Sequence, residues 1–339
     1  MNKINCALVG VGHDHAHDIY DYITKEESSF NLTSIILLEK DENYYNQWKS
    51  DYDKYPQKTL EEILNDSSIE AVFIECEDSL LSKYAAMFAK KGIHVHMDKP
   101  GAQDKNEFDN AINLARSNNV AFHLGYMYRY NPSIKEALKL HREGALGQVY
   151  YIEAQMNISH PEPKKIWLNN FKGGMMNFLG CHLIDLVCLF LGKPDSVVSY
   201  NTRSKEAYGE DIALAVLKYG NYYSTVNSTM VEIDGFSRRH VVLVGEKATI
   251  EIAPTELFIN GELYSKTKYK TLGDNPLIES GEVNYGPTHR YRDMIEEFAL
   301  IVRGGITNPY SYDYEIMVHD TLLAACNEVG KEIKLWKRL

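Results

Sequence analysis

The chain has 339 residues, of which 44% are hydrophobic and 24% are charged, the composition of an ordinary globular protein. A chain of this length exceeds one typical hydrophobic core, so we expect two domains. The net charge of −11 at pH 7 excludes a basic surface for nucleic-acid phosphates. No apolar run approaches the length of a membrane span, and no N-terminal segment has the pattern of a signal peptide.

The five cysteines include no Cys-x-x-Cys pair and lie in apolar segments, so we expect reduced core residues. Their odd number agrees with a reducing compartment. We therefore expect a cytoplasmic protein that binds small molecules and neither nucleic acid nor membrane.

The first third alternates strand-like and helix-like segments, which predicts βαβ units and a doubly wound parallel sheet. The expected strands are 4–9, 32–38, 71–75, 94–97 and 121–124. The expected helices are 15–24, 44–52, 60–65, 80–91 and 105–117. We place a dinucleotide-binding domain at residues 1–124.

From Gly125 onward the pattern changes to long alternating strands with a few helices, which predicts an α/β domain over residues 125–339 with a large, mostly antiparallel open sheet. The expected strands are 149–158, 196–201, 212–219, 222–231, 239–244 and 248–252. The expected helices are 133–143, 181–191, 290–302 and 314–329. One face of this sheet is free to pack against a partner subunit.

A glycine turn, Gly10-Val11-Gly12, follows the first strand and leads into the first helix. Such a turn lets the backbone approach a pyrophosphate at the helix N-terminus. Glu39 lies at the end of the second expected strand, where a carboxylate accepts the ribose hydroxyls and favours NAD over NADP. The neighbouring Lys40 weakens this discrimination, so NADP remains the alternative cofactor.

Lys99 follows the fourth strand in the motif Asp98-Lys99-Pro100. Ligands of open parallel sheets collect outside the carboxyl ends of the strands, so we expect this ammonium beside the bound dinucleotide. There it can bond a substrate hydroxyl and help to move its proton.

A second polar group lies in an apolar helix, where His182 and Asp185 are spaced i, i+3 after Gly173-Gly174. The glycines allow close approach of a bulky group, and His182 can act as a general base. A buried core histidine is the structural alternative.

Three histidines at positions 13, 15 and 17 have a spacing that suits a metal. A metal at the phosphate-binding turn would compete with the cofactor, so we expect no metal. We expect these side chains near bound phosphate or in solvent.

The order of these motifs, with Gly125-Tyr126-x-x-Arg129-x-x-Pro132 between them, resembles the Gfo/Idh/MocA oxidoreductases over nearly the whole chain. The resemblance implies a Rossmann domain, NAD(P), a sugar, polyol or related hydroxy substrate, and a homodimer or homotetramer built on the sheet face. It implies Lys99 and His182 as catalytic residues. The implied cofactor contacts are Gly10, Gly12, His13, Glu39, Cys76, Asp78, Asp98 and Lys99, and the implied substrate contacts are Arg129, Trp167, Asn177 and His182.

The sequence also departs from the family. Phe178 replaces the acid four residues before the histidine, and the loop from Cys76 to Leu81 lacks the usual Pro and His. Despite these departures, an NAD(P)-dependent dehydrogenase remains the leading hypothesis. The alternatives are an enzyme of epimerase, lyase or glycosidase type that retains its NAD without net redox, and a sugar-binding protein that has lost catalysis.

Overall fold

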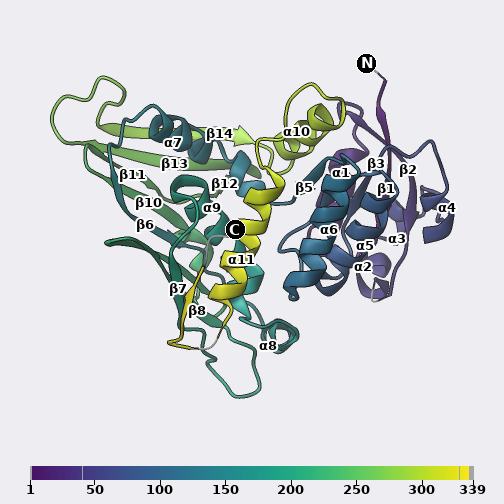
Figure 1. Cartoon of the computed structure of the whole chain (residues 1–339), viewed down its shortest axis with the longest axis horizontal. Coiled ribbons are helices and arrows are strands. Elements are labelled where there is room, and N and C mark those ends of the chain that lie inside the picture. The colour runs from purple at the N-terminus through teal and green to yellow at the C-terminus, as the bar shows by residue number, and fades with distance from the viewer. Residues whose placement is uncertain (1, 40, 328, 336–339) are drawn as a thin grey trace. The chain divides into compact units, whose positions relative to one another are not determined.

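The computed structural model describes residues 2–39, 41–327 and 329–335, and the chain divides into two compact units. The first unit comprises Met1–Tyr126 and Tyr291–Ile316, and the second comprises Met127–Arg290 and Met317–Leu339. Figure 1 labels the elements of both units. The sequence analysis placed a single boundary after residue 124, whereas residues 291–316 return to the first unit.

The first unit contains the expected parallel sheet, with the strand order β2-β1-β3-β4-β5. Its strands are β1 (Ile4–Val9), β2 (Phe30–Ile36), β3 (Ala71–Ile74), β4 (His94–Met97) and β5 (Phe122–Leu124). The chain runs from β1 outward to β2 and then returns to the other side of β1 at β3. This reversal is the switch point at which doubly wound sheets bind ligands.

Short helices connect these strands. They are α1 (Ala16–Ile23), α2 (Glu42–Gln47), α3 (Lys49–Tyr52), α4 (Leu60–Leu64), η1 (Asp78–Leu80), α5 (Leu81–Lys90) and α6 (Lys105–Ser117). The single helix predicted at 44–52 is wrong, because Trp48 leaves helical geometry and divides it into α2 and α3. Strand β2 ends at Ile36, so Glu39 lies in the loop beyond it.

Helix α10 (Arg292–Val302) belongs to the first unit because its aromatic residue packs on that unit's sheet. The ring of Phe298 lies 5.6 Å from Phe30, 5.8 Å from Phe73 and 5.4 Å from His123, measured between centroids. The sequence pattern predicted the helix but not the sheet that it covers.

The second unit is built on a ten-stranded sheet with the order β12-β13-β11-β10-β6-β9-β8-β7-β15, in which β14 pairs with β13. All its pairs are antiparallel except β6 with β9. The strands are β6 (Val149–Gln155), β7 (Ser196–Ser199), β8 (Ile212–Tyr219), β9 (Tyr222–Thr229), β10 (His240–Gly245), β11 (Ala248–Ile252), β12 (Leu257–Ile259), β13 (Glu262–Thr271), β14 (Gly281–Thr288) and β15 (Glu332–Lys334). The expected fold class is confirmed.

Strands β12 to β15 were not predicted. The buried face of β13 carries Ser265 and Thr267 beside Leu263 and Tyr269, so its hydrophobic alternation is weak. Strand β14 is exposed along most of its length and contains Gly286 and Pro287, which oppose a strand prediction.

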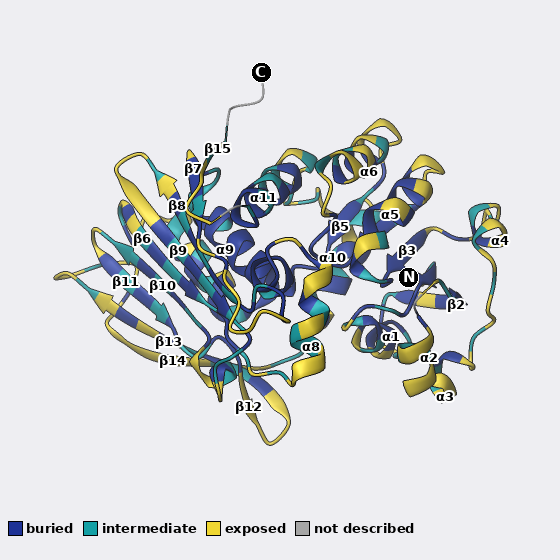
Figure 2. Cartoon of the chain, turned by 90° about the horizontal axis from the view of Figure 1, so that it is seen from below, coloured by how far each residue is buried: buried dark blue, intermediate teal, exposed yellow. Residues whose placement is uncertain are grey.

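The second unit also contains several helical segments. They are η2 (Met127–Tyr130), α7 (Pro132–Arg142), α8 (Glu162–Trp167), η3 (Leu168–Asn170), η4 (Met176–Gly180), α9 (Cys181–Leu191), η5 (Gly235–Arg238) and α11 (Tyr312–Ala325), which begins in the first unit. Helices α7 and α9 contact each other and the sheet, and α9 is buried almost throughout (Figure 2). The helix predicted at 314–329 includes residue 328, which lies outside the described residues.

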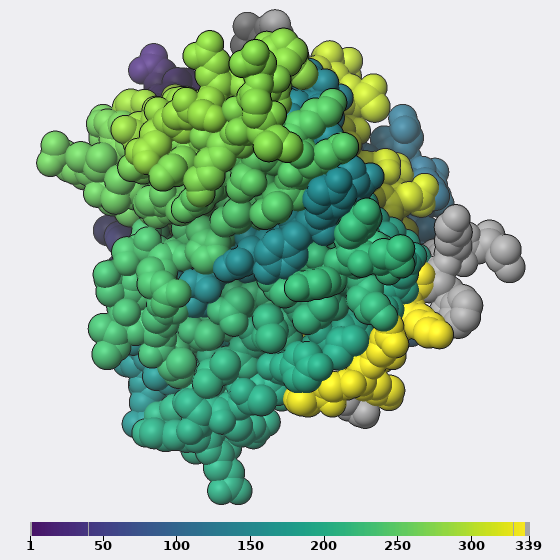
Figure 3. All heavy atoms as spheres, turned by 90° about the vertical axis from the view of Figure 1, so that its left-hand side faces the viewer, coloured from purple at the N-terminus to yellow at the C-terminus, as the bar shows by residue number. Residues whose placement is uncertain are grey.

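The face of the sheet opposite α7 and α9 carries half-buried apolar side chains on β8 and β10, with the polar Glu153 and Thr225 on β6 and β9 between them. Leu214 and Val216 on β8 lie on the same face as Val242 and Val244 on β10. The pairing of β8 with β9, of β9 with β6 and of β6 with β10 relates these positions. Figure 3 looks toward this side of the unit.

Two further expectations can be compared with the structure. All five cysteines are buried, and none of them forms a disulfide in the described chain. Among the described residues, no helix has both the length and the apolar character that a membrane crossing requires.

Candidate active site

The glycine turn after β1 is a place of close backbone approach. Gly10 has φ +78°, and a Cβ there would lie 2.5 Å from Cβ of Cys76. A Cβ on Gly12 would lie 2.6 Å from Oδ1 of Asp41 and 3.1 Å from the backbone nitrogen of Glu77. Cys76 therefore packs against the turn, and burial raises the pKa of its thiol well above the ordinary value. Only glycine fits at both positions.

Asp41 is a residue of this site that the sequence analysis missed. It is 2% exposed, and its Oδ2 accepts hydrogen bonds from the backbone N–H groups of Val11 (3.0 Å) and Leu38 (2.8 Å). Its other oxygen, Oδ1, is buried and has no hydrogen-bond partner within the described parts of the chain. Burial raises the pKa of Asp41 to about 6, against the opposing effect of the backbone N–H groups.

Glu39, the predicted ribose acid, is exposed in the loop, and Lys40 lies outside the described residues. Asp41 lies only two residues beyond Glu39, and Glu39 was chosen because the strand was expected to end at residue 38, two residues after its observed end at Ile36. A buried carboxylate oxygen beside the glycine turn fits the ribose hydroxyls of a dinucleotide, which are hydrogen-bond donors. The residues present thus fit the cofactor.

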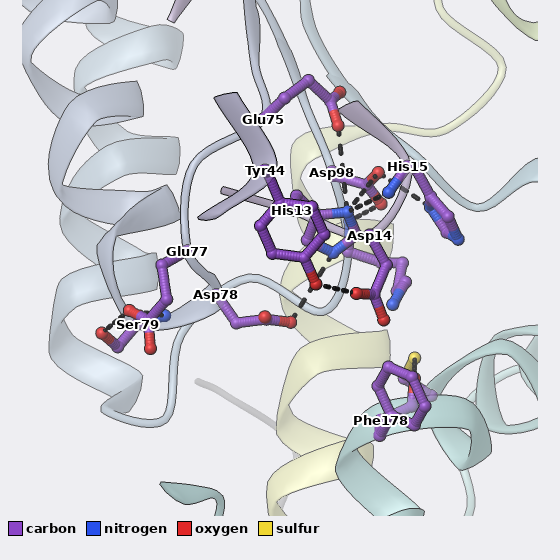
Figure 4. A network of polar contacts seen from close by, with 12 residues as sticks. His13, Asp14, His15, Tyr44, Glu75, Glu77, Asp78, Ser79, Asp98 and Phe178 are labelled. Carbon is purple, nitrogen blue, oxygen red and sulfur yellow. Dashed lines mark hydrogen bonds and ion pairs between the residues drawn. The ribbon is translucent and has the colours of Figure 1, made fainter. Parts of the chain in front are cut away.

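Three carboxylates surround the ring of His13 at the carboxyl ends of β3 and β4 (Figure 4). Nδ1 of His13 lies 3.1 Å from Oδ2 of Asp98 and 3.9 Å from Oε2 of Glu75, and Nε2 lies 3.6 Å from Oδ1 of Asp78. His15 joins the group, with Nδ1 2.9 Å from the same Asp98 oxygen. Of the two expected surroundings, bound phosphate or solvent, the structure excludes solvent for His13, which is 2% exposed, and a place near phosphate stays a prediction.

The charged side chains in this group shift one another's pKa values. Burial opposes protonation of His13, but Asp98 and then Asp78 outweigh it and raise the pKa of His13 to about 10. Burial also acts against ionisation of Asp98, yet His13 and His15 hold its pKa well below the usual range. Burial and the neighbouring Asp98 raise the pKa of Glu75 well above its ordinary value.

Lys99 follows Asp98 directly at the carboxyl end of β4. It is 1% exposed, and its backbone N–H donates to Oδ1 of Asp98 at 2.6 Å. Its charge lowers the pKa of His13, as a smaller effect than burial and the charge of Asp98. Lys99 is therefore a buried cation at the edge of the sheet where the glycine turn lies.

In the second unit, His182 is the second residue of α9 and is 1% exposed. Its ring lies 5.0 Å from that of Tyr128 in an edge-on arrangement. A π-helical turn, η4, precedes α9 and contains Asn177, whose buried Oδ1 has no hydrogen-bond partner in the described chain. Such turns are frequent at functional sites.

The glycine pair before this turn meets protein rather than open space. A Cβ on Gly173 would lie 2.5 Å from Cβ of Cys326, and one on Gly174 would clash with the backbone of Glu210. Both residues have positive φ, +84° and +44°. The glycine pair was expected to allow the close approach of a bulky group, and the group that approaches it is the protein chain itself.

Arg129 forms a buried ion pair with Asp185. Nε of Arg129 lies 3.1 Å and 3.0 Å from the two carboxylate oxygens, and Nη2 lies 2.7 Å from Oδ1. The pair joins η2 to α9 three residues after His182. This ion pair gives Arg129 a positioning role, and the substrate contact expected for Arg129 stays a prediction.

An aromatic group occupies the place of the missing family acid. The ring of Trp167 lies 4.5 Å from that of Phe171 and 5.3 Å from that of Phe178. Nζ of Lys164 lies 3.6 Å from the centroid of Trp167 and 4.9 Å from that of Phe178. This end of the second unit therefore combines an aromatic surface with a cation.

Comparison with known proteins identifies the class. Residues 4–126 match the model of the oxidoreductase family with an NAD-binding Rossmann fold, and residues 134–251 match the GFO/IDH/MocA C-terminal domain. The two models together span more than half of the chain, which belongs to the Gfo/Idh/MocA oxidoreductase family. The protein is an NAD(P)-dependent oxidoreductase whose first unit is the cofactor-binding Rossmann domain.

Individual relatives are distant. The chain is 23% identical over 281 residues to D-xylose 1-dehydrogenase (NADP(+)) 2 of Haloferax volcanii, covering 82% of this chain and 84% of that protein. The aldose-aldose oxidoreductase of Caulobacter crescentus, solved with glycerol, has a TM-score of 0.77 at 20% identity, covering 98% of this chain and 100% of that one. The WlbA dehydrogenase of Bordetella pertussis, solved with NADH and UDP-GlcNAcA, has a TM-score of 0.75 at 18% identity, covering 99% and 100%. At such identities the structural likeness establishes the fold alone.

Proposed function

We propose that this protein oxidises a hydroxyl group of a sugar, polyol or related hydroxy compound and passes the hydride to NAD(P). The observation that carries the proposal is the buried Lys99 at the carboxyl end of β4, in the Rossmann unit that contains the glycine turn. The sugar-related names of two of the relatives described above support the substrate class. The bound nicotinamide supplies the hydride acceptor.

Cofactor recognition is assigned to the glycine turn and to Asp41. Gly10 and Gly12 form the turn that takes the diphosphate and let it pack against Cys76 and Asp41, and Oδ1 of Asp41 accepts a ribose hydroxyl in place of the exposed Glu39. His13, Asp78 and Asp98 keep the carboxyl ends of β3 and β4 beside the turn. Cys76 contributes by packing against Gly10.

Proton transfer is assigned to Lys99 and His182. Asp98 positions Lys99 through the bond to its backbone N–H, and the Arg129–Asp185 pair positions the helix that carries His182. Asn177 offers a buried acceptor oxygen for a substrate hydroxyl, and Trp167 offers an aromatic face for the apolar side of a sugar ring.

The test measures reduction of the cofactor by its absorbance. NAD and NADP are tried separately, each with a panel of sugars, polyols and sugar acids. Replacement of Lys99 by Met is expected to lower kcat by about 10²- to 10⁴-fold, the typical share of a general acid–base group. NAD(P) affinity should stay within a few-fold. Lys105→Met, a surface lysine of the same unit, serves as the matched control.

The outcomes separate the hypotheses. A Lys99→Met variant as fast as the wild type would remove the assigned role. Turnover that needs no added cofactor, by protein that retains NAD through purification, would indicate the alternative without net redox. Tight sugar binding without turnover or bound dinucleotide would indicate a binding protein.

We also propose a homodimer or homotetramer formed through the open sheet face. The half-buried Leu214, Val216, Val242 and Val244 give that face two apolar strips, on β8 and β10, with the polar Glu153 and Thr225 between them. Light scattering after size exclusion is expected to give a multiple of 38.8 kDa for the wild type. The double variant Val216→Lys, Val242→Lys should give a smaller assembly, and an unchanged mass would contradict this assignment.

A further inference from the structure

We propose that Tyr128 and Glu256 are positioning residues that hold the imidazole of His182 in one orientation. The proposal deepens the function proposed above, and its consequence for catalysis rests on the proton transfer assigned there to His182. All the side chains involved belong to the second unit. Tyr128 touches His182, and Glu256 acts through Tyr128.

The ring of Tyr128 packs against the imidazole of His182. The two ring centroids lie 5.0 Å apart and the ring planes meet at 72°, which is an edge-on arrangement. Tyr128 is 3% exposed and His182 is 1% exposed. Aromatic pairs at this separation favour edge-on packing over a face-to-face sandwich, so the plane of one ring restricts the plane of the other. A shift of the Tyr128 ring would therefore turn or release the imidazole.

Glu256 fixes the far end of Tyr128. The hydroxyl of Tyr128 donates to Oε2 of Glu256 at 2.5 Å, a length typical of a hydroxyl bound to a carboxylate. Burial, and then the charge of Glu256, raise the pKa of Tyr128 above its ordinary value, so the hydroxyl keeps its proton and remains the donor. The bond joins η2 to the residue before β12, which lies 128 positions further along the chain.

Two arginines hold the carboxylate of Glu256 in turn. Nη1 of Arg239 lies 3.1 Å from Oε2 of Glu256, and it also donates to the hydroxyl oxygen of Tyr128 at 3.1 Å. Nε and Nη2 of Arg290 lie 2.8 Å and 2.7 Å from Oε1. Glu256 is 2% exposed, and charge-assisted bonds of this kind are stronger than neutral ones. The acceptor of the Tyr128 hydroxyl is therefore held firmly in place.

The residue after Tyr128 joins the same two elements. Arg129 forms the buried ion pair with Asp185, and Asp185 lies three residues after His182 on α9. Residues spaced i, i+3 lie on one side of a helix. Thus η2 meets one side of α9 at two points, through the ion pair at Asp185 and through the ring at His182. The ion pair holds the two elements together, and the bond to Glu256 sets the orientation of the Tyr128 ring.

A positioning role predicts a graded effect on the reaction. Misplacement of a reacting group by about 1 Å can cost about 100-fold in rate. Tyr128→Phe keeps the aromatic ring but frees it from Glu256, so we expect kcat to fall by roughly 10-fold. Tyr128→Leu removes the ring, so we expect a fall of about 100-fold. KM and NAD(P) affinity should stay within a few-fold in both variants, because no ligand contact is assigned to Tyr128.

The role of Glu256 is tested by combining variants. Glu256→Gln should lower kcat about as much as Tyr128→Phe does. In the Tyr128→Phe background the same change should lower kcat further by less than about 2-fold, because the hydroxyl through which Glu256 acts is already absent. Losses that multiply would show that Glu256 acts by another route and would overturn its assignment.

The orientation of the imidazole is measured without any turnover. In full-length protein isotopically labelled at histidine, the NMR signal of the His182 ring is identified by its absence from His182→Gln. This signal is expected to move in Tyr128→Phe and further in Tyr128→Leu, because the neighbouring aromatic ring is displaced or removed. A signal that stays at its wild-type position in both variants would overturn the proposal, as would a displaced signal with wild-type kcat.

Tyr269→Phe is the matched control. Tyr269 is a buried tyrosine of the second unit, and its hydroxyl bonds to that of Tyr285 on β14 at 2.8 Å. Its kcat and its His182 signal should equal those of the wild type. Circular dichroism shows that each variant folds.

Failure of the proposed function gives a different result. If His182→Gln turns over as fast as the wild type, or if no hydroxy compound is oxidised, the assigned proton transfer fails. The NMR signal of His182 then still decides whether Tyr128 and Glu256 hold the ring. If His182→Gln is slow and Tyr128→Phe is as fast as the wild type, only the positioning role fails.

Discussion

The guanidinium of Arg129 and the carboxylate of Asp185 form a two-pronged ion pair in which both side chains are at most 1% exposed. Removing one partner of a buried pair leaves an uncompensated charge, which typically costs about 3–5 kcal/mol. Arg129→Met and Asp185→Asn should therefore each lower the free energy of unfolding by roughly that amount, measured by urea denaturation.

The double variant Arg129→Met, Asp185→Asn is the control for this pair, because it removes both charges together. Its loss of stability should be smaller than the sum of the two single losses. Additive losses would mean that the two side chains are not coupled.

A second prediction concerns cofactor choice. Asp41→Asn keeps the shape of the side chain but removes its negative charge and replaces one acceptor oxygen by an NH₂ group. NAD affinity should therefore fall by about 10-fold or more, as expected for a lost hydrogen bond to a charged group. Discrimination against NADP should weaken at the same time, because a carboxylate repels a 2′-phosphate. Fluorescence titration with both dinucleotides measures the change.

Glu39→Gln provides the comparison for Asp41→Asn. Since Glu39 is exposed, its replacement should leave the affinity for both cofactors within a few-fold. A large loss at residue 39 and none at residue 41 would restore the assignment made from the sequence.

A third prediction concerns pH. Burial lowers the pKa of His96 to about 4, and its Nδ1 lies 2.8 Å from Nδ1 of His123, so one ring donates and the other accepts. Between pH 6.5 and 4 the unfolded chain binds a proton at this residue and the folded chain does not. The free energy of unfolding should therefore fall as the pH drops through this window. His96 contributes at most roughly 3 kcal/mol to this fall.

The contribution of His96 is isolated by difference. His96→Gln keeps a polar side chain toward His123 but does not titrate, so its unfolding free energy should fall less steeply than that of the wild type from pH 6.5 to 4. Equal slopes for the two proteins would show that His96 does not carry the effect.

A fourth prediction tests the glycine pair. Gly174→Ala combines a positive φ of +44° with a clash against the backbone of Glu210, and we expect a loss above about 3 kcal/mol or failure to fold. Gly220→Ala has a similar φ of +59° but open space around it, so strain of about 1 kcal/mol should be its whole cost. Thermal unfolding compares the two.

The sequence predicted the parallel sheet, the change of pattern near residue 125 and the polar residues at the strand ends. It did so because buried strands, glycine turns and helix ends have local signals. It missed β13, since Ser265 and Thr267 occupy its inner face, and it missed Asp41, since the end of β2 was placed two residues late. The ion pair of Arg129 with Asp185 depends on tertiary packing, for which the local pattern holds no signal.

The return of residues 291–316 to the first unit has a practical consequence for anyone who wishes to express the nucleotide-binding half alone. A gene fragment encoding residues 1–126 would lack Phe298, leaving the rings of Phe30 and Phe73 bare to water and prone to aggregate. A workable fragment would have to splice the later helix onto the end of the earlier piece.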